Sequence, residues 1–134
     1  MNPTKRNILA VVAAGTWINA SEFFRNEVLI KDLWAEHYWS LGLAFPSAPV
    51  NGMLWMLWGF VFAAMILAVS RRFDLLQTTL ICWLMAFVLM WIVIWNLLVM
   101  PAGLLTFALP LSLLEVFIAA YLCMKLSPPC AATC

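Results

Sequence analysis

Hydrophobic residues fill long stretches of this chain, and polar residues gather between them. In the clearest stretch, which lies between Asp74 and Lys125, Glu115 is the only charged residue. A water-soluble domain could not be so uniformly apolar and still offer a surface to water. The stretches lack the alternation typical of a strand, and an open backbone in lipid would stay unpaired, so helices are expected. The pattern therefore predicts an all-α integral membrane protein.

Four of the apolar stretches are long enough to cross a bilayer, because a crossing helix needs ~20 residues at ~1.5 Å per residue. Only residues 96–103 remain to reverse the chain between the last two stretches, so these two are expected to form an antiparallel hairpin. Pro101 is predicted to open the final helix, since proline at the first helical position loses no hydrogen bond. The four predicted transmembrane helices are 8–30, 51–70, 75–100 and 101–124.

The basic residues set the predicted orientation. Five of them fall on one side of the membrane if the chain crosses it four times, and the positive-inside rule makes that side cytoplasmic. Both termini are therefore predicted in the cytoplasm, with residues 1–126 as one transmembrane domain and 127–134 as a short tail. The expected location is a bacterial inner (plasma) membrane. The five residues are Lys5, Arg6, Arg71, Arg72 and Lys125.

The N-terminal stretch also has features of a secretory signal peptide. Two basic residues precede the apolar residues 8–14, and Ala20 offers a cleavage position. The apolar pattern resumes at Phe23, so we interpret the stretch as an uncleaved first helix.

The first loop on the outer side is predicted to hold a short amphipathic helix. Apolar residues recur at helical spacing in 31–43, with Asp32 as the expected N-cap and Gly42 as the stop. Aromatic side chains such as Trp34 and Trp39 favour the headgroup level, so this helix should lie at the membrane interface.

The first predicted helix carries a polar stripe. At 100° per residue its four polar members fall within an arc of about 120°, while Trp17 points the other way. Such a stripe must face the bundle interior, another subunit or a watery cavity. We weigh a structural ion pair or a helix that emerges into water against a solute- or ion-binding pocket, with catalysis as a third reading. The four residues are Asn19, Glu22, Arg25 and Asn26.

Glu115 lies near the middle of the last predicted helix, one turn after Ser112. A carboxyl group at this depth is expensive to keep charged, which fits a proton-coupled or cation-binding residue. It equally fits a protonated acid that is hydrogen-bonded to Asn19 or Thr16 across a helix contact. Arg25 is predicted nearer the outer surface, so a direct Arg25–Glu115 salt bridge is not expected unless the first helix bends or shifts.

A second polar position, Asn96, lies near the outer end of the third predicted helix. Tryptophans of the second and third predicted helices are expected near Asn96, although tryptophan favours the membrane interface in any case. Apolar walls with a few polar groups are the usual form of a ligand site. We therefore expect an aromatic-walled pocket beneath the loop that carries His37. The tryptophans are Trp55, Trp58, Trp91 and Trp95.

Composition excludes several classes of function. The chain is 66% hydrophobic and 10% charged, and its net charge of +1 includes no basic run suited to nucleic acid. It holds one histidine, no metal-binding spacing and no catalytic or nucleotide-binding motif, so no metal, cofactor or catalytic residue is predicted. Cys130 and Cys134 are expected in a frayed tail, with palmitoylation or a metal site shared between subunits as alternatives.

Three functions remain. The first is binding or translocation of a small solute or ion through a polar pocket in the outer half of the bundle, by an oligomer. The second is an accessory subunit whose polar stripe and small residues 13–15 dock on a larger membrane complex. The third is an intramembrane enzyme for a lipid-like substrate, with Glu22 or Glu115 as acid or base. Membrane lipids are the expected partners. The predicted ligand-binding residues are Asn19, Glu22, Arg25, Asn26, Trp95, Asn96 and Glu115.

Overall fold

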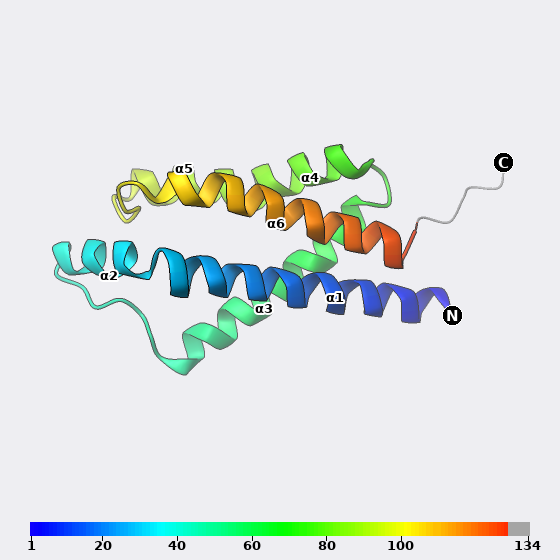
Figure 1. The fold of residues 1–134 in the computed structure, drawn as a ribbon, viewed down its shortest axis with the longest axis horizontal. Helices are drawn as coiled ribbons and strands as arrows, with labels where there is room; N and C mark the ends of the chain where they lie inside the picture. Colours follow the sequence, from blue (N-terminus) through cyan, green and yellow to red (C-terminus); the bar gives the residue numbers. More distant parts are fainter. Residues whose placement is uncertain (129–134) are drawn as a thin grey trace.

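The computed structural model describes residues 1–128, and throughout that part of the chain the regular structure is helical. Two of the helical segments are π-helical: η1 continues α1 to its end, and η2 lies between α4 and α5 in one longer helix. The N-terminus and the end of α6 lie at one end of an elongated bundle, while α2 and the α5–α6 turn lie at the other (Figure 1). The elements are α1 (Pro3–Phe23), η1 (Phe24–Leu29), α2 (Lys31–Ser40), α3 (Pro49–Val69), α4 (Leu75–Trp83), η2 (Leu84–Val88), α5 (Leu89–Asn96) and α6 (Leu104–Leu126).

Within residues 1–128, three helices are long and apolar enough to cross a membrane. They are Pro49–Val69, Leu75–Asn96 and Leu104–Leu126, with 21, 22 and 23 residues and mean hydropathies of 2.1, 2.2 and 2.0. The prediction of an all-helical membrane protein is thereby confirmed in its coarse form. The first helix, which carries the polar stripe, is not among the three.

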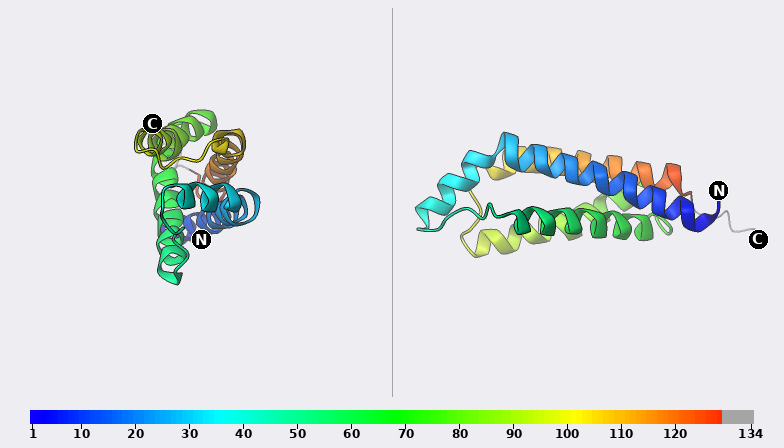
Figure 2. Two further views of the ribbon diagram at one scale, coloured as in Figure 1. Left: turned by 90° about the vertical axis from the view of Figure 1, so that its left-hand side faces the viewer. Right: turned by 90° about the horizontal axis from the view of Figure 1, so that it is seen from below.

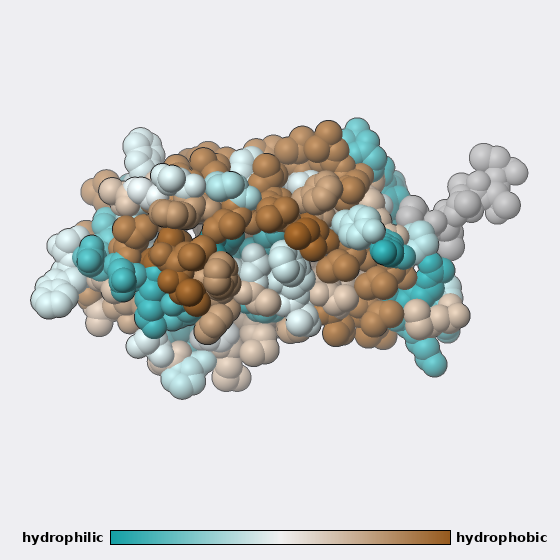
Figure 3. Space-filling view, viewed as in Figure 1, coloured by the Kyte–Doolittle hydropathy of each residue, from teal (hydrophilic) through white to brown (hydrophobic). Residues whose placement is uncertain are grey.

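The space-filling view supports the same conclusion (Figure 3). Hydrophobic residues cover the middle of the face that it shows, and hydrophilic residues gather towards the two ends of the bundle. Large apolar side chains on α3, the α4–α5 stretch and α6 are exposed, as lipid contact requires. Examples are Met53, Leu57, Val61, Leu76, Leu89, Ile92, Phe107 and Leu114.

The turn before α6 differs from its prediction. Pro101 precedes the final helix by three residues and does not open it, because Gly103, at φ +81°, stands immediately before Leu104. The preceding helix also ends early, at Asn96. The N–H groups of Leu98 and Val99 donate to the carbonyls of Trp95 and Ile94, both at 3.0 Å.

This pair of hydrogen bonds is a Schellman motif, which needs a left-handed residue at its centre. Leu98 takes that position at φ +59°, where glycine is the usual residue. The left-handed turn at Leu98 is therefore what ends the helix four residues short of the predicted Met100.

A second Schellman motif ends α2. Gly42, at φ +72°, donates to Trp39 at 2.8 Å, and Leu43 donates to Tyr38 at 2.9 Å. The predicted stop at Gly42 is confirmed. The predicted N-cap at Asp32 is wrong, because η1 ends only one residue before α2 and the carbonyl of Ile30 accepts the first helical bond, from Trp34.

Helix α1 lies lengthwise against α3 and α6 (Figure 2). Small residues permit the close approach: Ala10 and Ala14 are fully buried, and a Cβ added at Gly15 would overlap the ring of Phe60. These small residues of α1 are thus buried inside this bundle, with Gly15 against α3.

Candidate functional site

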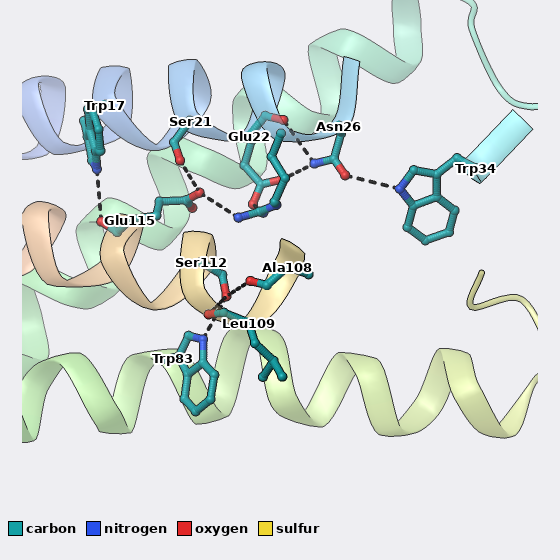
Figure 4. A network of polar contacts seen from close by, with 11 residues as sticks. Trp17, Ser21, Glu22, Asn26, Trp34, Trp83, Ala108, Leu109, Ser112 and Glu115 are labelled. Carbon is teal, nitrogen blue, oxygen red and sulfur yellow. Dashed lines mark hydrogen bonds and ion pairs between the residues drawn. The ribbon is translucent and has the colours of Figure 1, made fainter. Parts of the chain in front are cut away.

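Three charged side chains meet inside the bundle where α1 passes into η1 (Figure 4). Glu22, Arg25 and Glu115 are only 7%, 4% and 0% exposed. Nη1 of Arg25 donates to Oε2 of Glu115 at 3.1 Å, and Nη2 of Arg25 pairs with Oε1 of Glu22. The hydroxyl of Ser21 donates to the same Oε2 of Glu115 at 2.7 Å. We call Ser21, Glu22, Arg25 and Glu115 the charge cluster.

The direct Arg25–Glu115 contact corrects the sequence prediction, which placed Arg25 too far towards the outer surface. Helical side chains tilt towards the N-terminus, and this tilt brings the guanidinium of Arg25 back to the level of Ser21. The long side chain of Arg25 thus spans the difference in depth on which the prediction rested.

The predicted partners of Glu115 are also wrong. Nδ2 of Asn19 donates instead to the carbonyls of Gly15 at 2.8 Å and Met56 at 3.3 Å, and Thr16 is exposed. Trp17, predicted to point away from the stripe, donates through Nε1 to the backbone carbonyl of Glu115 at 3.0 Å. Trp17 therefore joins α1 to α6 one helical turn closer to the N-terminus of α1 than Ser21 of the charge cluster.

A line of hydrogen bonds leads from the charge cluster to α2. Nδ2 of Asn26 donates to Oε2 of Glu22 at 2.7 Å, and Oδ1 of Asn26 accepts from Nε1 of Trp34 at 3.3 Å. The contacts thus run from Glu115 of α6 through Arg25 and Glu22 to Asn26, and Figure 4 shows Asn26 between Glu22 and Trp34.

Aromatic rings close the other side of the charge cluster. The guanidinium carbon of Arg25 lies 5.3 Å from the ring centroid of Phe87, a cation–π distance. Arg25 is on η1 and Phe87 is on η2, so the cation and the ring come from the two π-helical segments. The centroid of Phe87 lies 5.9 Å from those of Trp58 and Trp91 and 6.0 Å from that of Phe62.

Ser112, one turn before Glu115, belongs to a separate contact. It accepts from Nε1 of Trp83 at 2.9 Å and donates to the carbonyl of Ala108 at 2.6 Å. This contact joins α4 to α6.

The two remaining predicted site residues lie apart from the charge cluster. Trp95 is 67% exposed, and Asn96 is exposed as well. Trp95 lines a shallow, open depression with His37 and the residues of the α5–α6 turn, and Asn96 is not among its lining residues. His37 docks α2 on that turn through Nε2, 2.9 Å from the carbonyl of Leu98.

One atom of the charge cluster stands out. Oε1 of Glu115 is buried and has no hydrogen-bond partner within residues 1–128. Two carboxyl groups also share a single guanidinium, so the charges do not balance if both acids are ionised. Buried polar atoms usually have a hydrogen-bond partner, so this oxygen is the position at which the site can bind a further atom or ion.

The sequence reasoning missed Ser21 and Phe87 as members of the site. Ser21 is a neighbour of Glu22 and could have been found from that position, whereas Phe87 looks like any other core residue of an apolar stretch.

No group of three or more histidine, cysteine or acidic side chains within residues 1–128 could hold a metal ion. Cys82 and Cys123 are buried free thiols. The expectations for Cys130 and Cys134 concern positions outside the described residues.

Comparisons of the chain with protein-family models, with curated proteins and with solved structures find no match. The site is therefore interpreted from its own geometry.

Proposed function

We propose that this protein crosses a membrane four times and binds or translocates a small solute or ion at the charge cluster. The observation that carries the proposal is the burial of two acids and one guanidinium between α1–η1 and α6. A structural ion pair needs one carboxylate only. The second is available to a ligand, and intramembrane ionisable groups commonly mark solute or ion paths.

The position of the first helix supports four crossings. Residues 3–29 form a continuous helical stretch of roughly 40 Å at ~1.5 Å per residue. This stretch lies beside α6, which is a candidate span, so both occupy the same depth (Figure 1). The four residues of its polar stripe are buried or half-buried, which keeps them away from lipid.

The orientation follows from charge. The basic residues of the two termini and of the α3–α4 turn lie at one end of the bundle, which the positive-inside rule places in the cytoplasm. The opposite end then faces outward, with α2 at the interface and Trp39 exposed on it. Lipid covers the apolar faces of α3, α4 and α5.

Access to the charge cluster is proposed from this outer end. The hydrogen bonds of Asn26 connect Glu22 to Trp34 of α2. A ligand that enters from α2 along these side chains, or displaces them, therefore reaches Glu22 before Glu115. On the cytoplasmic side of Glu115, α6 presents the buried apolar residues Ala119, Ala120 and Cys123.

The proposal is tested with purified protein in liposomes. Efflux of Na⁺, K⁺, H⁺, chloride, glycine and glycerol is measured for the wild type, Glu115→Gln and protein-free vesicles. At least one probe should leave faster with the wild type, and Glu115→Gln should lose the difference. Glu27→Gln is the matched control, because Glu27 is on η1 but pairs with Lys31 outside the cluster. Efflux of all six probes at the protein-free rate would contradict the proposal.

A further inference from the structure

We propose that the ligand of the charge cluster is a single proton, held on Oε1 of Glu115. This inference rests on the proposed function, since it names what the same site binds.

The charge count leads to one proton. With both acids ionised, Glu22 and Glu115 carry two negative charges against the one positive charge of Arg25. The surplus charge would be buried in an apolar bundle, where an unpaired ion is strongly disfavoured. One added positive charge makes the cluster neutral.

The hydrogen bonds indicate which oxygen receives the proton. Oε2 of Glu115 accepts from Ser21 and Arg25, and the two oxygens of Glu22 accept from Arg25 and Asn26. Only Oε1 of Glu115 is left without a donor. A proton there forms a neutral carboxylic acid whose carbonyl oxygen, Oε2, keeps both of its hydrogen bonds.

The neighbouring helices bring no other charge to Glu115. Helix α3 has no titratable residue, α4 has only Cys82, and η2 and α5 have none. The groups that face Glu115 are Glu22 and Arg25 from α1 and η1. The count of two acids and one base is therefore complete for this site.

A metal ion fits these atoms poorly. It would need several oxygen ligands at once, while three of the four carboxylate oxygens in the cluster are already hydrogen-bonded. A proton needs one. In the binding step a hydronium ion from water transfers its proton to Oε1, an O–H bond forms, and one water molecule remains.

Infrared spectroscopy of the protein in liposomes tests the proposal, because a protonated carboxylic acid has a carbonyl stretch that a carboxylate lacks. At pH 7 the wild type should show one such band per chain. Glu115→Gln and Glu22→Gln should both lose it, since either change leaves one acid balanced by Arg25. Arg25→Gln should double the intensity of the band, because two acids then remain without a base. Glu27→Gln, the control, should keep the wild-type band.

Two further variants show which acid holds the proton. Glu115→Asp should shift the frequency of the band, and Glu22→Asp should leave it unchanged. The reverse result would place the proton on Glu22 and overturn the assignment.

The wild-type spectrum alone decides the main claim, whatever the folding of the variants. Absence of the band at pH 7 would overturn the proposal. A band present in choline buffer and lost in Na⁺ buffer would also overturn it, in favour of a metal cation.

The outcome is separate from that of the efflux experiment. A band with no efflux of any probe keeps the proton site and removes the proposed function. Efflux that depends on Glu115 without a band keeps the function and removes the proton.

Discussion

Replacing Arg25 with methionine should destabilise the folded protein by about 3–5 kcal/mol. Methionine keeps the apolar stem of the side chain and removes the guanidinium. Two hydrogen bonds from a cation are lost, to Glu22 and to Glu115, and each is worth roughly 1.5–3 kcal/mol. Removing one partner of a buried ion pair costs about 3–5 kcal/mol in soluble proteins, which agrees with this sum.

The measurement is the free energy of unfolding in mixed micelles, from SDS titrations followed by tryptophan fluorescence. Acidification should recover part of the loss, because protonated carboxyl groups no longer need the guanidinium. Lys31→Met is the matched control: it removes the exposed 2.7 Å ion pair between Lys31 of α2 and Glu27 of η1, and should change little. If Arg25→Met is no more destabilising than Lys31→Met, the guanidinium is not a buried partner of the two acids.

Three other substitutions test local features by the same unfolding assay. Leu98→Gly should stabilise the protein by about 1 kcal/mol, because glycine adopts the left-handed conformation without a Cβ clash, and a loss of stability would contradict the Schellman motif. Trp83→Phe should cost about 0.5–1.5 kcal/mol through the lost hydrogen bond to Ser112, so an unchanged stability would argue against that α4–α6 contact. Gly59→Ala should destabilise the protein, since its Cβ would lie 2.5 Å from Nδ2 of Asn19, and combination with Asn19→Ala should reduce the penalty; equal penalties in both backgrounds would refute the close approach.

The coarse fold could be predicted because lipid imposes a simple composition on crossing helices. Three long apolar stretches became helices within a few residues of their predicted bounds. Gly42 could be predicted as a stop because glycine is the residue that most readily takes a left-handed turn. The turn at Leu98 could not be predicted, since leucine rarely adopts a positive φ and gives no such signal.

The membership of the site could be predicted only in part. Glu22, Arg25 and Glu115 were identified because charged residues in apolar helices are rare. Their contact was missed because the prediction compared the depths of backbone positions, whereas the long side chain of Arg25 reaches back towards the N-terminus of its helix. Phe87, which contacts the guanidinium of Arg25, could not be predicted because nothing in the sequence distinguishes it from the other apolar residues of its helix.

The central claim is that Arg25 and Glu115 contact each other inside the bundle, and a double-mutant cycle measures that contact most directly. Arg25→Met and Glu115→Met are made singly and together, and the free energy of unfolding is determined for all four proteins. A contact of this kind predicts a coupling energy of about 1–3 kcal/mol, with Arg25→Met less costly when Glu115 is already absent. Additive effects, equal to within about 0.5 kcal/mol, would mean that the two side chains do not meet and would contradict the account.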